Sequence, residues 1–422
     1  MSSLNTQPEA PLSGVRVLEF AHTIMGPCCG MMLADLGAEV LKIEPPDGDR
    51  TRRLKGFGTG YFGFFNRNKK SLAIDLKNPR GQEIMRDLLR TADVVIENFA
   101  PATMARLGLG YEDIARINDR VVYCSLKGFL NGPFQHRVAL DEVVQMMGGL
   151  AYMTGPSGRP LRAGASVIDI MGGSYGALAI MLALQQRRTT GRGQLVESGL
   201  FETTAFLMGQ HLAYAAQSSG PIPPMAERVS AWAVYETFDT KDGEKVFIGI
   251  ISDQQWTRFC NVFGLSELAS DDGLRTNNDR IRARPTLIAR LQQLFGSLRR
   301  SEIEALCERA EIAFAPVARP EDLFDNPHLN ANGTLMPTVL PGGIHTKLPQ
   351  LPIRMGGNGF PLRLNPPRLG EHTRPILASL GYTENEIAAL ENETVIVADA
   401  PGEEALHPNR EEQSVRRLST GT

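Results

Sequence analysis

The chain has 422 residues, of which 42% are hydrophobic and 22% are charged, and its formal net charge is -3. This is the composition of an ordinary globular protein, and it argues against nucleic acid or an anionic membrane surface as a partner. The five cysteines are an odd number, and Cys28 and Cys29 are adjacent rather than spaced as metal ligands would be. With no clustered His/Cys ligand set, we expect no metal and no permanently bound cofactor.

The chain start and the apolar runs bear on localisation. The first residues contain neither a basic segment nor an apolar signal segment. The longest apolar run, residues 177–184, is far shorter than the roughly 18 residues that a membrane span needs. We therefore expect a cytoplasmic protein that does not enter a membrane.

The first half of the chain alternates between strand and helix patterns. Strands are predicted over residues 15–20, 38–44, 94–96 and 121–126, and helices over residues 30–36, 79–91 and 111–117. Such alternation predicts an α/β fold with a mainly parallel sheet that carries helices on both faces. The basic run 185–193 is then predicted to be an exposed connection, and residues 194–216 show an amphipathic helical pattern.

A Ser/Gly/Pro-rich stretch at residues 218–224 is the clearest break in the chain. Beyond it, two strand patterns around an Asp242-Gly243 turn predict a hairpin, and helical patterns follow at residues 254–263, 285–296 and 301–310. We therefore expect a small α+β domain over residues 225–330. The large domain would span residues 12–220 and be completed by an irregular, Pro/Gly-rich return segment over residues 331–395, with flexible tails at residues 1–11 and 399–422.

A dinucleotide-binding protein would begin with a similar strand and helix pattern. Its signature is a G-x-G-x-x-G turn after the first strand and an acidic residue at the end of the second strand. Glu44 fits the acidic position, but the first turn reads AHTIMGPCCG, whose bulky side chains would block close approach of a pyrophosphate. The sequence therefore disfavours a nicotinamide or flavin cofactor.

Asp169 is a single acidic residue between apolar neighbours, just before a Gly172-Gly173 pair and an apolar run. Burying an unpaired carboxylate costs free energy, so this residue requires an explanation. One interpretation is a helix N-cap, in which the carboxylate accepts backbone N–H groups. The other is a catalytic nucleophile. The residues alone leave both interpretations open, and position alone favours the cap.

Several stretches together resemble one family. They are PLSGVRVLEF, MLADLGAEVLKIEPPDGD, NRNKKSLAIDLKNPRG, VVIENFAPATMARLGLGYEDI, ALDEVVQMMGGLAYMTG, TTGRGQLVESGLFE and PPRLGEHTRPILASLGY, in order over residues 12–395. In this combination the chain resembles the class III CoA-transferases, the CaiB/BaiF-like family of formyl-CoA transferase and carnitine CoA-transferase. The resemblance implies a Rossmann-like large domain with an inserted small α+β domain, and a homodimer of two interlocked rings.

The resemblance also implies that Asp169 is the catalytic nucleophile. In this family the aspartate attacks an acyl-CoA thioester to form a mixed anhydride, and CoA thiolate then gives an aspartyl-CoA thioester that the acceptor acid consumes. An unperturbed Asp, with a pKa of about 3.9, would be ionised without a general base. Backbone N–H groups of Gly172 and Gly173 are candidates for stabilising an oxyanion.

Matching positions suggest the residues that contact CoA. His22, Thr23, Ile24 and Met25 would form a loop beside the pantetheine, and Lys69 and Leu72 would lie near the adenosine phosphate. Asn98, Phe99 and Arg106 would line the CoA site, with Arg137 and Asp141 near the thioester. For Lys69 the alternative is a solvated charge, and for Asn98 it is a turn cap. Arg50, Arg52 and Arg53 are expected at the surface.

Departures from the family pattern refine the function. Racemases of this superfamily carry Gly-His-Asp where this chain has Ala139-Leu140-Asp141, and Leu140 cannot transfer a proton. The consecutive glycines of formyl-CoA transferase are replaced by residues 249–255, which argues against formyl and oxalate specificity. We expect transfer of CoA from an acyl-CoA, by analogy succinyl-CoA, to a small carboxylic acid, by analogy a dicarboxylate. A 2-methylacyl-CoA racemase and a non-catalytic CoA-binding protein are the alternatives.

Overall fold

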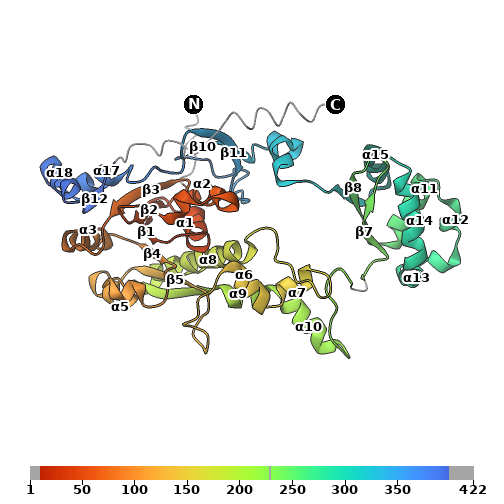
Figure 1. Cartoon of the computed structure of the whole chain (residues 1–422), viewed down its shortest axis with the longest axis horizontal. Helices are drawn as coiled ribbons and strands as arrows, with labels where there is room; N and C mark the ends of the chain where they lie inside the picture. Colours follow the sequence, from red (N-terminus) through yellow and green to blue (C-terminus); the bar gives the residue numbers. More distant parts are fainter. Residues whose placement is uncertain (1–9, 228–229, 399–422) are drawn as a thin grey trace. The chain divides into compact units, whose positions relative to one another are not determined.

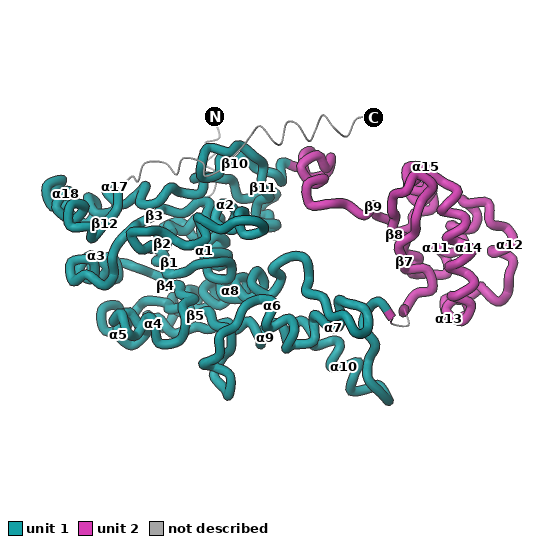
Figure 2. The backbone as a smooth tube through the Cα atoms, in the orientation of Figure 1, with its two compact units in different colours: residues 1–226, 333–422 teal, residues 227–332 magenta. Residues whose placement is uncertain are grey.

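The computed structural model describes residues 10–227 and 230–398. The chain divides into two compact units, one of residues 1–226 and 333–422 and one of residues 227–332 (Figure 2). The tails predicted at residues 1–11 and 399–422 lie outside the described residues, apart from Ala10 and Pro11.

The first unit is built on a seven-stranded sheet with the order β12-β3-β2-β1-β4-β5-β6 (Figure 1). Its strands are β1 (Arg16–Phe20), β2 (Glu39–Glu44), β3 (Lys69–Ile74), β4 (Val94–Glu97), β5 (Val122–Lys127), β6 (Gln194–Gly199) and β12 (Ile396–Val397). All neighbouring strands pair in parallel except β12, which pairs antiparallel with β3. The prediction of an α/β fold with a mainly parallel sheet is confirmed.

Two apolar layers cover the sheet because neighbouring residues of a strand face opposite sides. Val17 of β1 packs in a core with helices α1 (Met25–Asp35) and α8 (Val167–Thr190), whereas Leu18 packs in a core with α3 (Pro79–Leu89) and α5 (Tyr111–Ile117). Helices α17 (Thr373–Ser379) and α18 (Glu384–Asn392) join the second core. The C-terminal segment therefore contributes to the same folded unit as the N-terminal half.

The rest of the first unit consists of shorter elements. They are α2 (Thr59–Phe65), α4 (Thr103–Arg106), α6 (Asp141–Met147), α7 (Leu150–Thr154), α9 (Leu200–Leu207), α10 (Gly209–Gln217) and the antiparallel hairpin of β10 (Leu335–Leu340) and β11 (Ile344–Pro349). The hairpin lies within the return segment of residues 331–395, which was predicted to be irregular.

Two predictions around α8 are wrong. Residues 185–190 are the last turns of α8, which ends at Gly191 with a positive φ of 73° rather than in an exposed loop at residue 185. Residues 194–199 form strand β6, not the start of a helix, because they pair along the whole of β5. Helix α8 is also long and apolar enough to cross a membrane by length and composition alone, and 39% of its apolar window is buried within the chain. A single helix of this kind is weak evidence for a membrane span.

The second unit contains a three-stranded antiparallel sheet in the order β7-β8-β9 and its own apolar core. The strands are β7 (Val234–Asp239), β8 (Lys245–Ile250) and β9 (Ala313–Pro316), and the predicted hairpin is the β7–β8 pair. Its helices are α11 (Asp253–Val262), α12 (Ser266–Ala269), α13 (Asn277–Arg282), α14 (Arg284–Gly296), α15 (Arg300–Ala310) and α16 (Pro327–Ala331).

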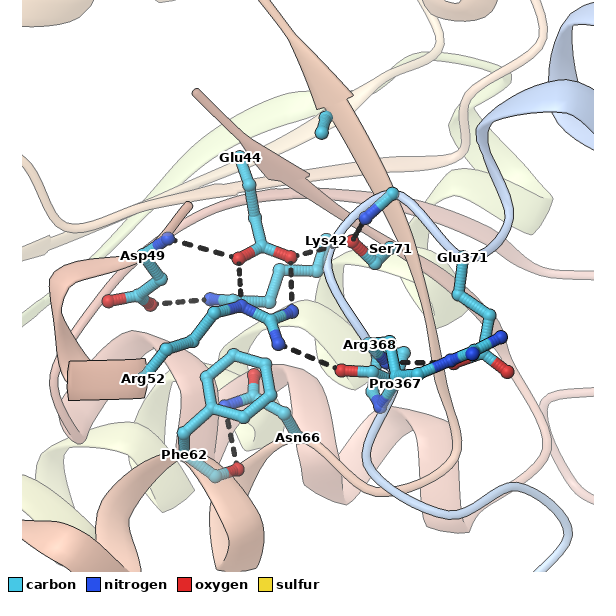
Figure 3. Close-up of polar contacts among 12 residues, drawn as sticks. Lys42, Glu44, Asp49, Arg52, Phe62, Asn66, Ser71, Pro367, Arg368 and Glu371 are labelled. Atoms are coloured by element: carbon cyan, nitrogen blue, oxygen red, sulfur yellow. Dashed lines mark hydrogen bonds and ion pairs between the residues drawn. The ribbon is translucent and has the colours of Figure 1, made fainter. Parts of the chain in front are cut away.

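A buried network of charges lies at the end of β2 (Figure 3). The Glu44 carboxylate accepts two hydrogen bonds from Arg52, at 2.7 and 2.8 Å, and one from Ser71 Oγ at 2.7 Å. Burial alone would raise the pKa of Glu44, but Arg52 outweighs it and holds the pKa below its usual range. The expectation that Arg52 is a surface residue is therefore wrong, and Glu44 has no free oxygen for a ribose.

Candidate active site

Helix α8 carries the candidate nucleophile in its first turn. Val167 is its first residue and Asp169 its third, and Ser166 precedes the helix without a side-chain cap hydrogen bond. Another carboxylate caps the helix, since Asp141 Oδ2 accepts from the backbone N–H groups of Ile168 at 2.9 Å and Asp169 at 3.1 Å. The interpretation of Asp169 as the helix cap is therefore wrong.

The side chain of Asp169 is half-buried, and its carboxylate accepts no hydrogen bond from the described part of the chain, residues 10–227 and 230–398. Burial raises its pKa to about 7, the negative charge of Asp141 adds to the rise, and Arg162 opposes it. The expectation of an unperturbed pKa near 3.9 is therefore wrong, and near neutral pH the group is divided between its acid and carboxylate forms.

The Asp141 carboxylate lies against the first turn of α8, beside Asp169. The Asp141 side chain is buried, and both carboxylate oxygens are used inside the protein, Oδ2 by α8 and Oδ1 by Gln145 and Arg162. The structure therefore gives the Asp141 side chain internal partners, and the predicted substrate contact stays a prediction. Sequence reasoning missed Gln145 and Arg162, and the only signal for them was their nearness in the chain to Asp141 and Asp169.

Gly172 and Gly173 lie on the face of α8 that packs against α1. A Cβ on Gly173 would stand 2.5 Å from the backbone oxygen of Met25, and one on Gly172 would stand 2.7 Å from Met25 Cε. As the sixth and seventh residues of the helix, both donate their N–H groups to carbonyls four residues earlier. The oxyanion assignment is therefore wrong, because these glycines allow close helix packing instead.

The predicted pantetheine loop lies against this part of α8. Met25, the first residue of α1, contacts Gly172 and Gly173, so the preceding loop of His22, Thr23 and Ile24 enters beside the first turns of α8. Thr23 has a positive φ of 68°, an uncommon conformation for a residue with a side chain. Such strain persists only where the surroundings hold it, and it gathers at functional sites.

Asn98 and Phe99 hold the same loop. The Asn98 side chain accepts from His22 N at 3.0 Å and donates to His22 O at 2.8 Å, while the Phe99 and His22 rings stack 5.7 Å apart. Burial lowers the pKa of His22, with Lys42 and Arg50 acting in the same direction and Asp49 opposing them. The surface of His22 is accessible although its ring is partly enclosed, and the lowered pKa favours its neutral form, so this group offers a polar and aromatic surface rather than a charge.

Lys69 and Leu72 are not available to a nucleotide. The Lys69 ammonium is fully buried, pairs with Glu19 at 2.7 Å and donates to Pro27 O at 2.9 Å. Leu72 is fully buried in the apolar core. Both predictions of a CoA contact are therefore wrong, and Lys69 instead ties the start of α1 to the sheet. Burial lowers its pKa to about 8, although Glu19 opposes the shift.

Arg106 and Arg137 are exposed cations. Arg106 donates to Thr103 Oγ1 within α4, and the Arg137 guanidinium lies over the Phe134 ring at 4.9 Å. Neither contact joins them to Asp169 or to the His22 loop. Within residues 10–227 and 230–398, no three His, Cys, Asp or Glu side chains gather in a way that could hold a metal ion.

A parallel α/β sheet, no glycine-rich dinucleotide turn, and an unengaged carboxylate at a helix start together fit an acyl-group-transfer enzyme that uses an oxygen nucleophile. Comparison with known proteins then defines the family. The model of CoA-transferase family III matches residues 12–373, and the chain belongs to this family and is a CoA-transferase.

Individual relatives agree with this assignment. The chain is 34% identical over 388 residues to succinyl-CoA:glutarate CoA-transferase of Mus musculus, covering 90% of this chain and 89% of the relative. It is 33% identical to succinate–glutarate CoA-transferase of Agrobacterium fabrum, covering 89% of this chain and 96% of the relative. A crystal structure of a CaiB/BaiF family protein from Brucella suis superposes with a TM-score of 0.78 at 32% identity, over 88% of this chain and all of that one.

Proposed function

We propose that this CoA-transferase moves CoA from succinyl-CoA to a small dicarboxylate of the glutarate type, with Asp169 as nucleophile. The observation that carries the proposal is the Asp169 carboxylate, which is exposed enough to react, receives no hydrogen bond and is partly ionised near neutral pH. The names of the relatives supply the donor and the acceptor class.

The proposed reaction proceeds through four acyl transfers. The Asp169 carboxylate attacks the thioester carbonyl of succinyl-CoA, the C–S bond breaks, and a mixed anhydride and CoA thiolate result. The thiolate attacks the Asp169 carbonyl and releases succinate, leaving an aspartyl-CoA thioester. The acceptor carboxylate attacks this thioester to give a second anhydride and thiolate, and the thiolate then takes the acceptor acyl group and frees Asp169. No step needs a metal or a redox partner.

We assign CoA contacts to the residues that the structure leaves accessible. The loop of His22, Thr23, Ile24 and Met25, held by Asn98 and Phe99, would lie beside the pantetheine, because it enters next to the first turns of α8. Arg106 and Arg137 are free at the surface to pair with phosphate oxygens. CoA is a substrate in this scheme and not a resident cofactor.

We further propose a cytoplasmic homodimer of interlocked rings. Large apolar side chains lie exposed on the first unit, namely Leu178 and Leu182 on α8, Phe206 on α9 and Leu212 on α10. Exposed apolar groups on neighbouring elements are typical of an interface. Sedimentation velocity should give a single species of twice the chain mass, and a monomer at micromolar concentration would contradict the proposal.

The decisive test of the nucleophile is chemical. Incubation with succinyl-CoA should give a hydroxylamine-sensitive mass increase on the peptide that contains Asp169, and Asp169→Asn should lose both this adduct and transfer to glutarate. Asp113→Asn is the control, because Asp113 is also a first-turn carboxylate but pairs with Arg116 on the surface of α5. Full activity of Asp169→Asn would refute the mechanism, and solvent deuterium at the α-carbon of a 2-methylacyl-CoA would indicate a racemase.

A further inference from the structure

The first turn of α8 needs outside help to satisfy its backbone. A helix start leaves four N–H groups without partners in the helix. Of these, Val167 N donates to Ala165 O at 2.9 Å, and the N–H groups of Ile168 and Asp169 donate to the Asp141 carboxylate. The first bond within the helix runs from Ile170 N to Ser166 O at 3.0 Å. Asp141 therefore completes the helix start from a different element.

Asp141 is itself fixed by its neighbours. Gln145, one turn further along α6, donates to Asp141 Oδ1, and Arg162 Nη2 lies 3.6 Å from the same oxygen. Gln145 Oε1 also accepts from the backbone N–H of Ala163 at 2.9 Å. Both side chains therefore join the first turn of α6 to the loop that leads into α8.

The Arg162 guanidinium is engaged mainly inside the protein. Its Nε donates to Ala163 O at 2.9 Å and its Nη2 to Ala165 O at 3.2 Å, while Nη1 pairs with Glu142 at 2.5 Å. A guanidinium with these internal hydrogen bonds stabilises the conformation of the loop. The cation nearest in sequence to Asp169 is thus part of the support of this loop.

We propose that Asp141, held by Gln145 and Arg162, is a positioning residue that caps helix α8 in place of Asp169 and so keeps the Asp169 carboxylate free to react. The inference rests on the proposed function, in which Asp169 is the nucleophile. An acidic side chain at a helix start ordinarily turns back onto free N–H groups of its own first turn. With those groups occupied by Asp141, the Asp169 carboxylate keeps all its lone pairs for the thioester.

The test uses Asp141→Asn in the full-length enzyme. The variant weakens the cap, because an amide offers one acceptor oxygen, and its N–H₂ group would face the donors of Gln145 and Arg162. Misplacing a nucleophile by about 1 Å costs on the order of 100-fold in rate, so we expect kcat for succinyl-CoA and glutarate to fall about 10- to 100-fold. The KM for succinyl-CoA should change less than about twofold, because both Asp141 carboxylate oxygens have partners inside the protein.

The pH profile provides a readout that a purely structural role would not move. Three groups face Asp169: Asp141 on α6, Arg162 on the preceding loop and Cys28 on α1, whose pKa burial raises to about 12 so that it stays neutral. Removing the Asp141 charge should therefore shift the rising limb of kcat against pH to lower pH. Asp141→Glu, which keeps the charge, should leave the limb in place.

The outcomes separate this inference from the proposed function. The positioning role would be overturned if Asp141→Asn left kcat and the rising limb of its pH profile unchanged, or if it raised KM with a normal kcat. In either case an inactive Asp169→Asn variant would still support the proposed function. If Asp141→Asn fails to fold, Gln145→Leu provides the test, because it removes the hydrogen bonds of Gln145 and leaves Arg162 beside Asp141. This variant should lower kcat about tenfold with KM unchanged. A normal kcat there would also overturn the inference. Asp113→Asn is again the control, expected at wild-type rate and pH limb.

Discussion

The close packing of α1 against α8 predicts different outcomes for two neighbouring substitutions. Gly173→Ala would place a methyl group 2.5 Å from the Met25 backbone oxygen and 3.0 Å from Cys28 Cβ, so a helix must move. Gly172→Ala would come too close only to Met25 Cε, at 2.7 Å, the end of a flexible side chain that can turn away, while Leu200 Cδ2 at 3.5 Å is at ordinary contact distance. Both changes gain the same helix propensity, roughly 0.5–1 kcal/mol, because both lie inside α8.

The magnitudes follow from this difference. Overpacking against a fixed neighbour costs typically 1–3 kcal/mol, so Gly173→Ala should lower the free energy of unfolding by about 1–2 kcal/mol after the propensity gain. Gly172→Ala should stay within about 0.5 kcal/mol of wild type, since methionine adapts to irregular space. Urea unfolding followed by circular dichroism measures both. Equal stability of the two variants would refute the packing argument, and it would reopen a role for these N–H groups in catalysis.

Three further predictions concern charge. The rate kcat/KM should rise with pH through about 7, because only ionised Asp169 attacks, and a flat profile between about pH 5 and 9 would contradict this. Because the folded pKa of Asp169 lies above its unfolded value, the folded state binds more protons between about pH 4 and 7 and loses stability as pH rises. Asp169→Asn should therefore be more stable than wild type to urea at about pH 8, with the gain shrinking toward about pH 4. Arg52→Met should cost about 3–5 kcal/mol of unfolding free energy by leaving Glu44 buried without its partner, whereas Arg53→Met, which breaks an exposed pair with Asp47, should cost under about 1 kcal/mol.

Apolar periodicity explains which parts of the fold were predictable. Strands β1, β2, β4 and β5 are rich in Val, Leu and Ile, and each was found within a residue or two of its bounds. Strand β3 was missed because it opens with Lys69 and Lys70, which suggest a surface turn. The buried ammonium of Lys69 pairs with Glu19, and a local sequence pattern does not reveal a partner 50 positions away.

The candidate site shows the same limit. Asp169 could be singled out from its apolar surroundings, and the His22 loop from the family resemblance. The role of Asp141 could not, because its hydrogen bonds join residues 27 and 28 positions apart. The raised pKa of Asp169 was equally hidden, since burial and the charge of Asp141 both arise from tertiary packing.

The antiparallel pairing of β12 with β3 has a consequence for synthesis of the protein. Strand β3 leaves the ribosome about 320 residues before β12, which at roughly 5–20 residues per second is an interval of about 15 to 60 seconds. During this time the outer edge of β3 has no strand to pair with, and an open edge invites pairing with another chain. The nascent protein is therefore exposed to aggregation at this edge until β12 has been translated, and chaperone occupancy should be highest in that window.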